Sequence, residues 1–151
     1  MLGIAAALIL LAAPPSGGGE ILPDRELVPF AVAGGEIPAP LTATPGDPTR
    51  GREIAAGRQA NCLACHHMPI PEERFHGDLG PDLAGVAERL TEGELRLRLV
   101  DPKRIDEASV MPAFYRAHGL TRVARRYRDR PILAAQQIED VIAYLMTLNE
   151  P

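Results

Sequence analysis

The clearest pattern of apolar and polar positions lies near the C-terminus of the chain. Apolar residues recur there at steps of three and four positions, at Ile138, Val141, Ile142, Leu145 and Leu148. Such spacing places all of them on one face of an α-helix. It predicts an amphipathic helix over residues 135–149.

Two shorter helices are predicted from their end signals. Asp47 followed by Pro48 is typical of an N-cap and a first helical residue, and we expect this helix to run to about residue 59. Gly51 has no side chain, so another helix could cross close to it. Thr91 and Glu94 have the spacing of a capping box at the start of the next helix.

That next helix has Leu95 and Leu99 on one stripe and is expected to end at the Asp-Pro pair of residues 101–102. No stretch alternates between apolar and polar residues as a half-buried strand would. The pattern therefore predicts an all-α protein with long irregular connections.

An unbroken apolar run occupies residues 2–13. It is too short to span a bilayer, which needs about 20 apolar residues, and it has the length of a signal-peptide core. A segment rich in proline and glycine follows at once, although no Lys or Arg precedes the run. We interpret residues 1–19 as a signal peptide for export to the periplasm; the alternative is a buried strand or helix of the mature domain.

Residues 20–47 are rich in proline, which keeps the backbone extended. The segment also has more apolar residues than an ordinary spacer, namely Ile21, Leu22, Leu27, Val28, Phe30 and Ile37. We interpret it as an extended arm that lies across a partner, with a flexible leader as the alternative. Residues 48–151 then form a single domain.

The strongest chemical motif is Cys62-Leu63-Ala64-Cys65-His66, a C-x-x-C-H sequence. Its two thiols can each bond to one vinyl group of a haem, and the histidine then becomes an axial ligand of the iron. A thioredoxin-like pair would need a βαβ setting, and a zinc site would need further ligands. The sequence has no Trp and only 4% aromatic residues, so a buried porphyrin would also supply missing core volume. The motif predicts one covalent haem c.

The second axial position has several candidate ligands: Met68, Met111, Met146, His67, His76, His118 and Lys103. The first choice is Met111, because it lies in a loop after the second predicted helix and Pro112 stiffens that loop. A thioether ligand raises the reduction potential of the iron. With His66 and Met111 both bound, the iron would have no open position, which indicates electron transfer rather than chemistry on a substrate.

A ligand histidine needs an acceptor for its other ring nitrogen. Gly80 and Pro81 form a sharp turn soon after the motif. We expect the Pro81 carbonyl to accept a hydrogen bond from His66, although the same residues could simply be a turn that starts a helix.

The chain carries a net charge of −4, which does not indicate nucleic-acid binding. Against this acidic balance, a cluster of arginines precedes the last helix, at Arg122, Arg125, Arg126, Arg128 and Arg130. The cluster is either a solvated loop or a docking or anion-steering surface.

Several segments together resemble the SoxX subunit of the SoxAX cytochrome of sulfur oxidation. They are NCLACH at 61–66, MPIPEERFHG at 68–77, LGPDL at 79–83, MP at 111–112 and IEDVIAYL at 138–145. The most specific is the insertion at 68–77. The sequence departs from the pattern in three places: Ala60, before Asn61, stands where glycine is expected, Ala134 replaces a threonine N-cap, and Pro112 is followed by Ala113.

The resemblance implies a class I cytochrome c-like helical domain around one haem, in a heterodimer with a SoxA subunit. In that family the complex joins thiosulfate oxidatively to a cysteine of the carrier protein SoxYZ, at a haem of SoxA. The SoxX haem accepts the electrons and passes them to an acceptor such as a small cytochrome c. Both cysteines of this chain, Cys62 and Cys65, are used for haem attachment, which agrees with this division of labour.

Two other functions remain open at this point. One is a free-standing periplasmic electron carrier without an enzyme partner. The other is a catalytic or gas-binding haem with an open position, which a Met111 ligand would argue against.

Overall fold

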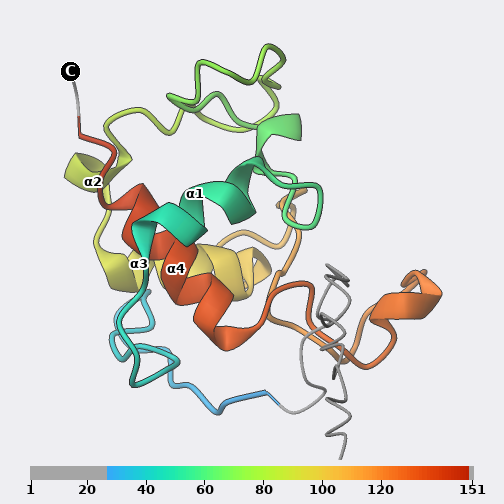
Figure 1. The fold of residues 1–151 in the computed structure, drawn as a ribbon. Helices are drawn as coiled ribbons and strands as arrows, with labels where there is room; N and C mark the ends of the chain where they lie inside the picture. Colours follow the sequence, from blue (N-terminus) through green and yellow to red (C-terminus); the bar gives the residue numbers. More distant parts are fainter. Residues whose placement is uncertain (1–26, 150–151) are drawn as a thin grey trace, which may run out of the picture.

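The computed structural model describes residues 27–149, so the predicted signal peptide and the first part of the arm lie outside it. Its α-helices are α1 (Pro48–Ala56), α2 (Val86–Arg89), α3 (Glu92–Val100) and α4 (Ala135–Leu145) (Figure 1). Long loops with 3₁₀ turns join α1 to α2 and α3 to α4, whereas residues 90–91 join α2 to α3. Within residues 27–149 no strand forms, and an isolated bridge joins Ala33 to Glu36. The predicted all-α class is confirmed. No described helix has both the length and the apolar character needed to cross a membrane.

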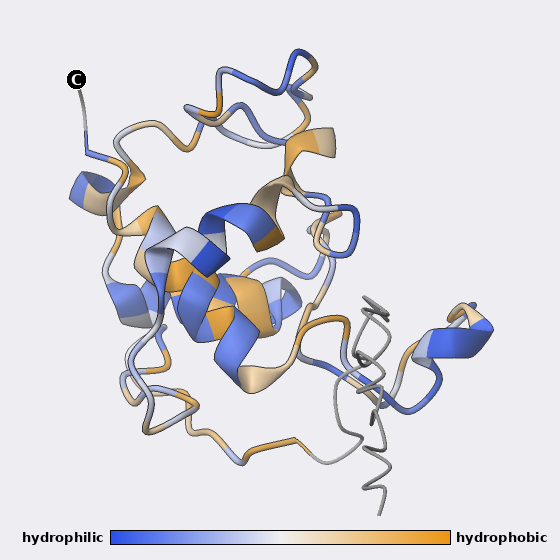
Figure 2. Cartoon of the chain, viewed as in Figure 1, coloured by the Kyte–Doolittle hydropathy of each residue, from blue (hydrophilic) through white to orange (hydrophobic). Residues whose placement is uncertain are grey.

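The core lies where α1 and α3 pack against α4. The close approach predicted at Gly51 is present, because a Cβ atom there would overlap the carbonyl oxygen of Asp140 in α4. Figure 1 shows α1 crossing α4 at this point. The apolar faces of α3 and α4 meet beneath the crossing, whereas polar residues cover the outer face of α1 (Figure 2).

The predicted helix starts are confirmed in detail. The Asp47 side chain accepts hydrogen bonds from the backbone N–H groups of Thr49 and Arg50. Thr91 and Glu94 form the reciprocal capping box at the start of α3.

Two helices end earlier than the sequence predicts. Helix α1 stops at Ala56 rather than near residue 59, where the Gly57 N–H reaches back to the carbonyls of Glu53 and Ile54. Helix α4 stops at Leu145 rather than at residue 149. Leu148 is nevertheless buried, and its carbonyl accepts a hydrogen bond from Ala87, so tertiary packing replaces the last helical turn.

The arm changes character near residue 36. Ile37 and Leu41 are only 1% and 4% exposed and belong to the core. The backbone N–H of Ile37 donates to the Gly93 carbonyl at 3.0 Å, and that of Leu41 donates to Glu139 Oε1 at 2.9 Å. Residues 36–47 are therefore packed on the chain's own helices. Within this part of the predicted arm, Ile37 and Leu41 fill the space beside α3 and α4.

Candidate haem site

The cysteine motif follows a backbone turn that depends on Asn61. This residue has φ 52° and ψ 40°, in the left-handed helical region. Asparagine is one of the few residues other than glycine that adopts this conformation readily. Asn61 therefore suits the turn that precedes Cys62. A 3₁₀ turn, Cys62–Ala64, follows at once, and the His66 N–H donates to the Cys62 carbonyl at 2.9 Å.

The two cysteines are half-buried and do not form a disulfide with each other. Burial raises the pKa of the Cys62 thiol to about 11. The cysteines of thioredoxin-like redox pairs have the opposite shift, toward a stabilised thiolate. This environment does not suit thiol–disulfide exchange, and the described residues contain no cluster of three or more metal-binding side chains that would favour zinc.

The His66 ring is positioned by the backbone of residues 80–81. Its Nδ1 lies 2.7 Å from the Pro81 carbonyl oxygen, the contact expected from the sequence. The Gly80 N–H donates to the Cys65 carbonyl at 2.7 Å, and a Cβ atom on Gly80 would overlap the imidazole. Gly80 is thus a site residue that the sequence analysis did not assign, because its role depends on a contact across the turn.

The insertion at residues 68–77 folds back onto the motif. Met68 and Ile70 are each 1% exposed, and the Gly77 N–H donates to the Leu63 carbonyl at 2.8 Å. A Cβ atom on Gly77 would overlap the Ala64 carbonyl. The insertion therefore covers the cysteine loop and anchors it to the core.

Met111 lies half-buried at the wall of a largely apolar pocket of about 540 Å³. The other residues that line it are Lys103, Ala108, Ser109, Val110, Pro112, Ala113, Arg116, Leu120 and Ile132. Cys62, Cys65 and His66 do not line this pocket. Lys103, another candidate ligand, is already engaged: its Nζ donates to the carbonyls of Glu107 and Ser109 at 3.2 and 2.7 Å.

Hydrogen bonds connect the Met111 loop to the segment that carries the cysteines. The Phe114 N–H donates to the Leu99 carbonyl at the end of α3, and the Ile132 N–H donates to the Phe114 carbonyl, both at 2.9 Å. Gln59, three residues before Cys62, donates to the Ile132 carbonyl at 2.6 Å. Two thiols, an imidazole held by a carbonyl and a thioether beside an apolar pocket form a donor set that fits haem c.

Comparison with known proteins identifies the family. The family model described as cytochrome c matches residues 48–149. A chain of the crystal structure of SoxXA from P. pantotrophus is similar, with 38% sequence identity and a TM-score of 0.74. The match covers 80% of this chain and 95% of the P. pantotrophus chain. This chain belongs to the cytochrome c family, as a SoxX-type subunit. No curated protein matches the sequence.

As a SoxX-type cytochrome, the chain binds one covalent haem c with iron and transfers electrons. The other candidate ligands lie in different environments, and His76 accepts a hydrogen bond from the Met68 N–H at 3.3 Å through its Nδ1. Met68 is fully buried in the core, and Met146 caps α4 and packs against the core. His67 Nδ1 lies 3.0 Å from a carboxylate oxygen of Asp82, and His118 is exposed.

Proposed function

We propose that this cytochrome is the electron-accepting subunit of a heterodimeric SoxAX-type L-cysteine S-thiosulfotransferase. Its haem would receive the electrons released when thiosulfate is joined to a cysteine of the SoxYZ carrier, and would pass them to an acceptor such as a small cytochrome c. The observation that carries the proposal is the 38% identity over 95% of a SoxXA chain. Catalysis is assigned to the SoxA subunit.

The number of cysteines in the chain supports this assignment. The chain has two cysteines, and both belong to the haem-attachment motif, so no thiol is left to carry sulfur. Without a third cysteine the chain cannot supply the sulfur-carrying ligand of the reaction. The part that remains for this chain is the acceptance of electrons.

We assign the haem-binding roles to five residues. Cys62 and Cys65 would form the two thioether bonds to the haem, His66 and Met111 would ligate its iron, and the Pro81 carbonyl would orient His66. The bound haem supplies a one-electron couple. With His66 and Met111 both bound to the iron, the chain's own residues would leave no position for a substrate or for water.

The proposed location is the periplasm, with residues 1–19 as the signal peptide. The covalent haem supports this location, because bacterial c-type haem is attached outside the cytoplasmic membrane. Mass spectrometry of the exported protein tests it: we expect the haem-loaded chain to begin near residue 20. A mature chain that retained residues 2–13 would contradict it.

The partner assignment is tested by co-expression with the SoxA-like chain of the same organism. We expect a complex that stays together in gel filtration and contains haem on both subunits. Recovery of this cytochrome as a monomer only, with its haem spectrum intact, would favour the free-standing periplasmic carrier. The exposed apolar side chains of Val28 and Val32 in the arm favour the complex, because a diffusing carrier gains nothing from them.

A further inference from the structure

The arginine cluster forms a distinct surface, which we call the basic lobe and define as residues 120–130. It lies between buried Ala117 and buried Pro131, so both of its ends are anchored to the body of the protein. Its single 3₁₀ turn, Arg125–Tyr127, stands apart from the packed helices α1, α3 and α4 (Figure 1). Figure 2 shows this turn as hydrophilic.

The lobe carries an excess of positive charge, most of it on exposed arginines. Residues 120–130 contain five arginines and one aspartate, a local charge of +4 in a chain whose net charge is −4. The exposed members are Arg122, Arg125, Arg126 and Arg128. Among residues 27–149, no carboxylate forms an ion pair with any of these four, whereas Arg50, Arg52 and Arg96 each pair with at least one carboxylate.

The base of the lobe reaches the predicted distal side of the haem site. Leu120 at its start and Ile132 just after its end line the same apolar pocket as Met111. A partner bound on the lobe would therefore lie beside the Met111 loop, on the side of the site away from the cysteine motif.

We propose that the basic lobe is the electron-exit surface, where a negatively charged redox protein docks to take electrons from the haem. The inference depends on the proposed function in one respect, that the haem passes electrons on. The exposed arginines are spread along a projecting segment: Arg122 and Arg128 line an open hollow of about 370 Å³ together with exposed Asp129, whereas Arg125 and Arg126 lie outside it. This arrangement suits an extended acidic surface better than a small anion.

The composition of the lobe fits such a surface. Arginine and tyrosine are enriched at the centres of protein interfaces, and Arg126 lies over the ring of Tyr127 at 4.9 Å from its centroid. An excess of positive charge on one surface of an acidic protein also orients an acidic partner before contact and raises the association rate.

Small oxidants of opposite charge test the proposal. The haem-loaded full chain is reduced and mixed in a stopped-flow instrument with ferricyanide (an anion) or with tris(phenanthroline)cobalt(III) (a cation). Each takes one electron, so that ferrous haem becomes ferric while the oxidant is reduced by one electron. In the triple variant Arg125→Gln, Arg126→Gln, Arg128→Gln we expect ferricyanide oxidation to slow roughly threefold to tenfold at low ionic strength. The rate of oxidation by the cobalt complex should be unchanged or faster in the variant. The difference in rate between the variant and the wild type should vanish at high salt.

The matched control is the triple Arg→Lys variant at the same positions, which keeps the charge and should keep the ferricyanide rate. An unchanged ferricyanide rate in the glutamine variant, with an intact haem spectrum, overturns the proposal. If the ferricyanide rate of the glutamine variant is unchanged and the variant also loses the SoxA-like partner in gel filtration, the proposal is again contradicted. The lobe would then be a subunit interface. Failure of both oxidants to oxidise the wild-type haem would instead contradict the electron-transfer function itself.

Discussion

The imidazole of His66 is positioned by backbone atoms alone. Pro81 offers a carbonyl with no N–H of its own beside it, and Gly80 leaves the space that the ring occupies. This arrangement orients the ring through the nitrogen that does not face the metal. Any side chain at residue 80 would enter the volume of the ring, so the need for glycine there is steric.

The distal ligand gives the prediction at the scale of single residues. Replacing Met111 with Ala removes the thioether while leaving the pocket wall otherwise intact. We expect loss of the weak far-red absorption band of methionine-ligated ferric haem and a lower reduction potential, because thioether ligation favours ferrous iron.

Met146→Ala is the matched control, because Met146 packs against the core and should not affect that band. Persistence of the band in Met111→Ala would show that another side chain is the ligand.

Helix α4 is the element on which the rest of the domain assembles. Glu139 and Asp140 are adjacent in α4, but their carboxylates bind different segments of the chain. Glu139 binds the guanidinium of buried Arg96 in α3 through two hydrogen bonds of 2.8 and 2.9 Å. Arg96 in turn donates to the Ile37 carbonyl, so that one ion pair connects α3, α4 and the arm. Removing Arg96 would cost about 3–5 kcal/mol, because the buried charge of Glu139 would stay behind without its ion-pair partner.

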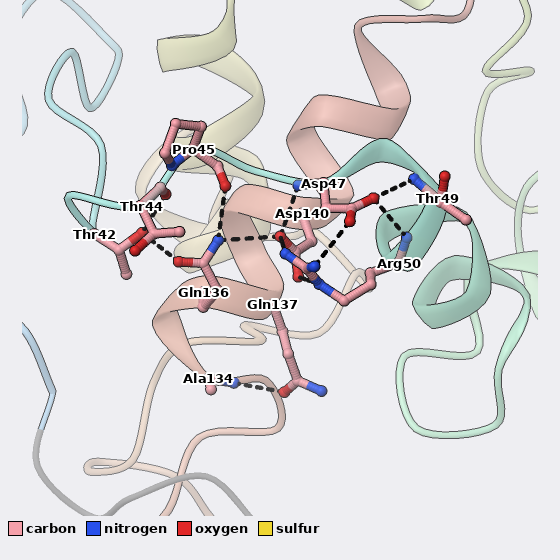
Figure 3. A network of polar contacts seen from close by, with 10 residues as sticks. All are labelled: Thr42, Thr44, Pro45, Asp47, Thr49, Arg50, Ala134, Gln136, Gln137 and Asp140. Atoms are coloured by element: carbon pink, nitrogen blue, oxygen red, sulfur yellow. Dashed lines mark hydrogen bonds and ion pairs between the residues drawn. The ribbon is translucent and has the colours of Figure 1, made fainter.

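Asp140 connects α4 to the start of α1 (Figure 3). Its carboxylate accepts hydrogen bonds from the Asp47 backbone N–H at 2.8 Å and from the Arg50 side chain at 3.0 Å. Gln136, one turn earlier, donates to the same carboxylate and to the Pro45 carbonyl. Burial alone would raise the pKa of Asp140, but the hydrogen bonds from Arg50, the Asp47 backbone and Gln136 outweigh it and hold the pKa below its ordinary value.

A lowered pKa in the folded state makes the contribution of Asp140 depend on pH. The contribution is complete above the unfolded pKa of about 3.9 and is lost as the pH falls through the lower folded value. We expect Asp140→Asn to destabilise the protein by about 1–2 kcal/mol at pH 7. The difference from wild type should shrink below pH 4, as urea unfolding at several pH values would show.

Glu53→Gln is the control for this measurement, since Glu53 is an exposed carboxylate of α1 that forms no ion pair within residues 27–149. If the difference in the free energy of unfolding between Asp140→Asn and the wild type stayed constant from pH 7 to pH 3, the lowered pKa of Asp140 in the folded state would be contradicted.

At the scale of the whole molecule, the arm has two parts with different roles. Residues 36–47 complete the core through Ile37 and Leu41. In residues 27–35 the contacts are lighter: the Val28 N–H donates to the Tyr115 hydroxyl at 2.8 Å, while the Val28 and Val32 side chains stay largely exposed. Binding to a partner therefore remains a prediction for this outer part.

Two truncations of the mature chain separate these roles. Deletion of residues 20–35 should leave the haem spectrum and the unfolding temperature nearly unchanged while weakening the complex with the SoxA-like chain. Deletion of residues 20–47 should destabilise the domain by roughly 3 kcal/mol or more, because buried leucine and isoleucine side chains are lost. Thermal unfolding and gel filtration measure both effects. Equal partner affinity after the shorter deletion would make residues 20–35 a plain linker.

The sequence by itself determined features that arise from local chemistry. The capping residues of α1 and α3, the amphipathic face of α4 and the C-x-x-C-H motif each depend on neighbours a few positions apart. The contact between His66 and the Pro81 carbonyl spans 15 positions, and it is expected from the chemical need of a ligand histidine for an acceptor.

The tertiary structure decided what depends on residues far apart in the chain. The ends of α1 and α4, the steric role of Gly80 and the packing of Ile37 and Leu41 beside α3 and α4 all result from contacts with other segments. The same holds for the pairing of Arg96 with Glu139, and for the lack of such a partner at the exposed arginines of the basic lobe. Local sequence specifies the propensity of each segment, but burial and charge pairing depend on which surfaces the folded chain brings together.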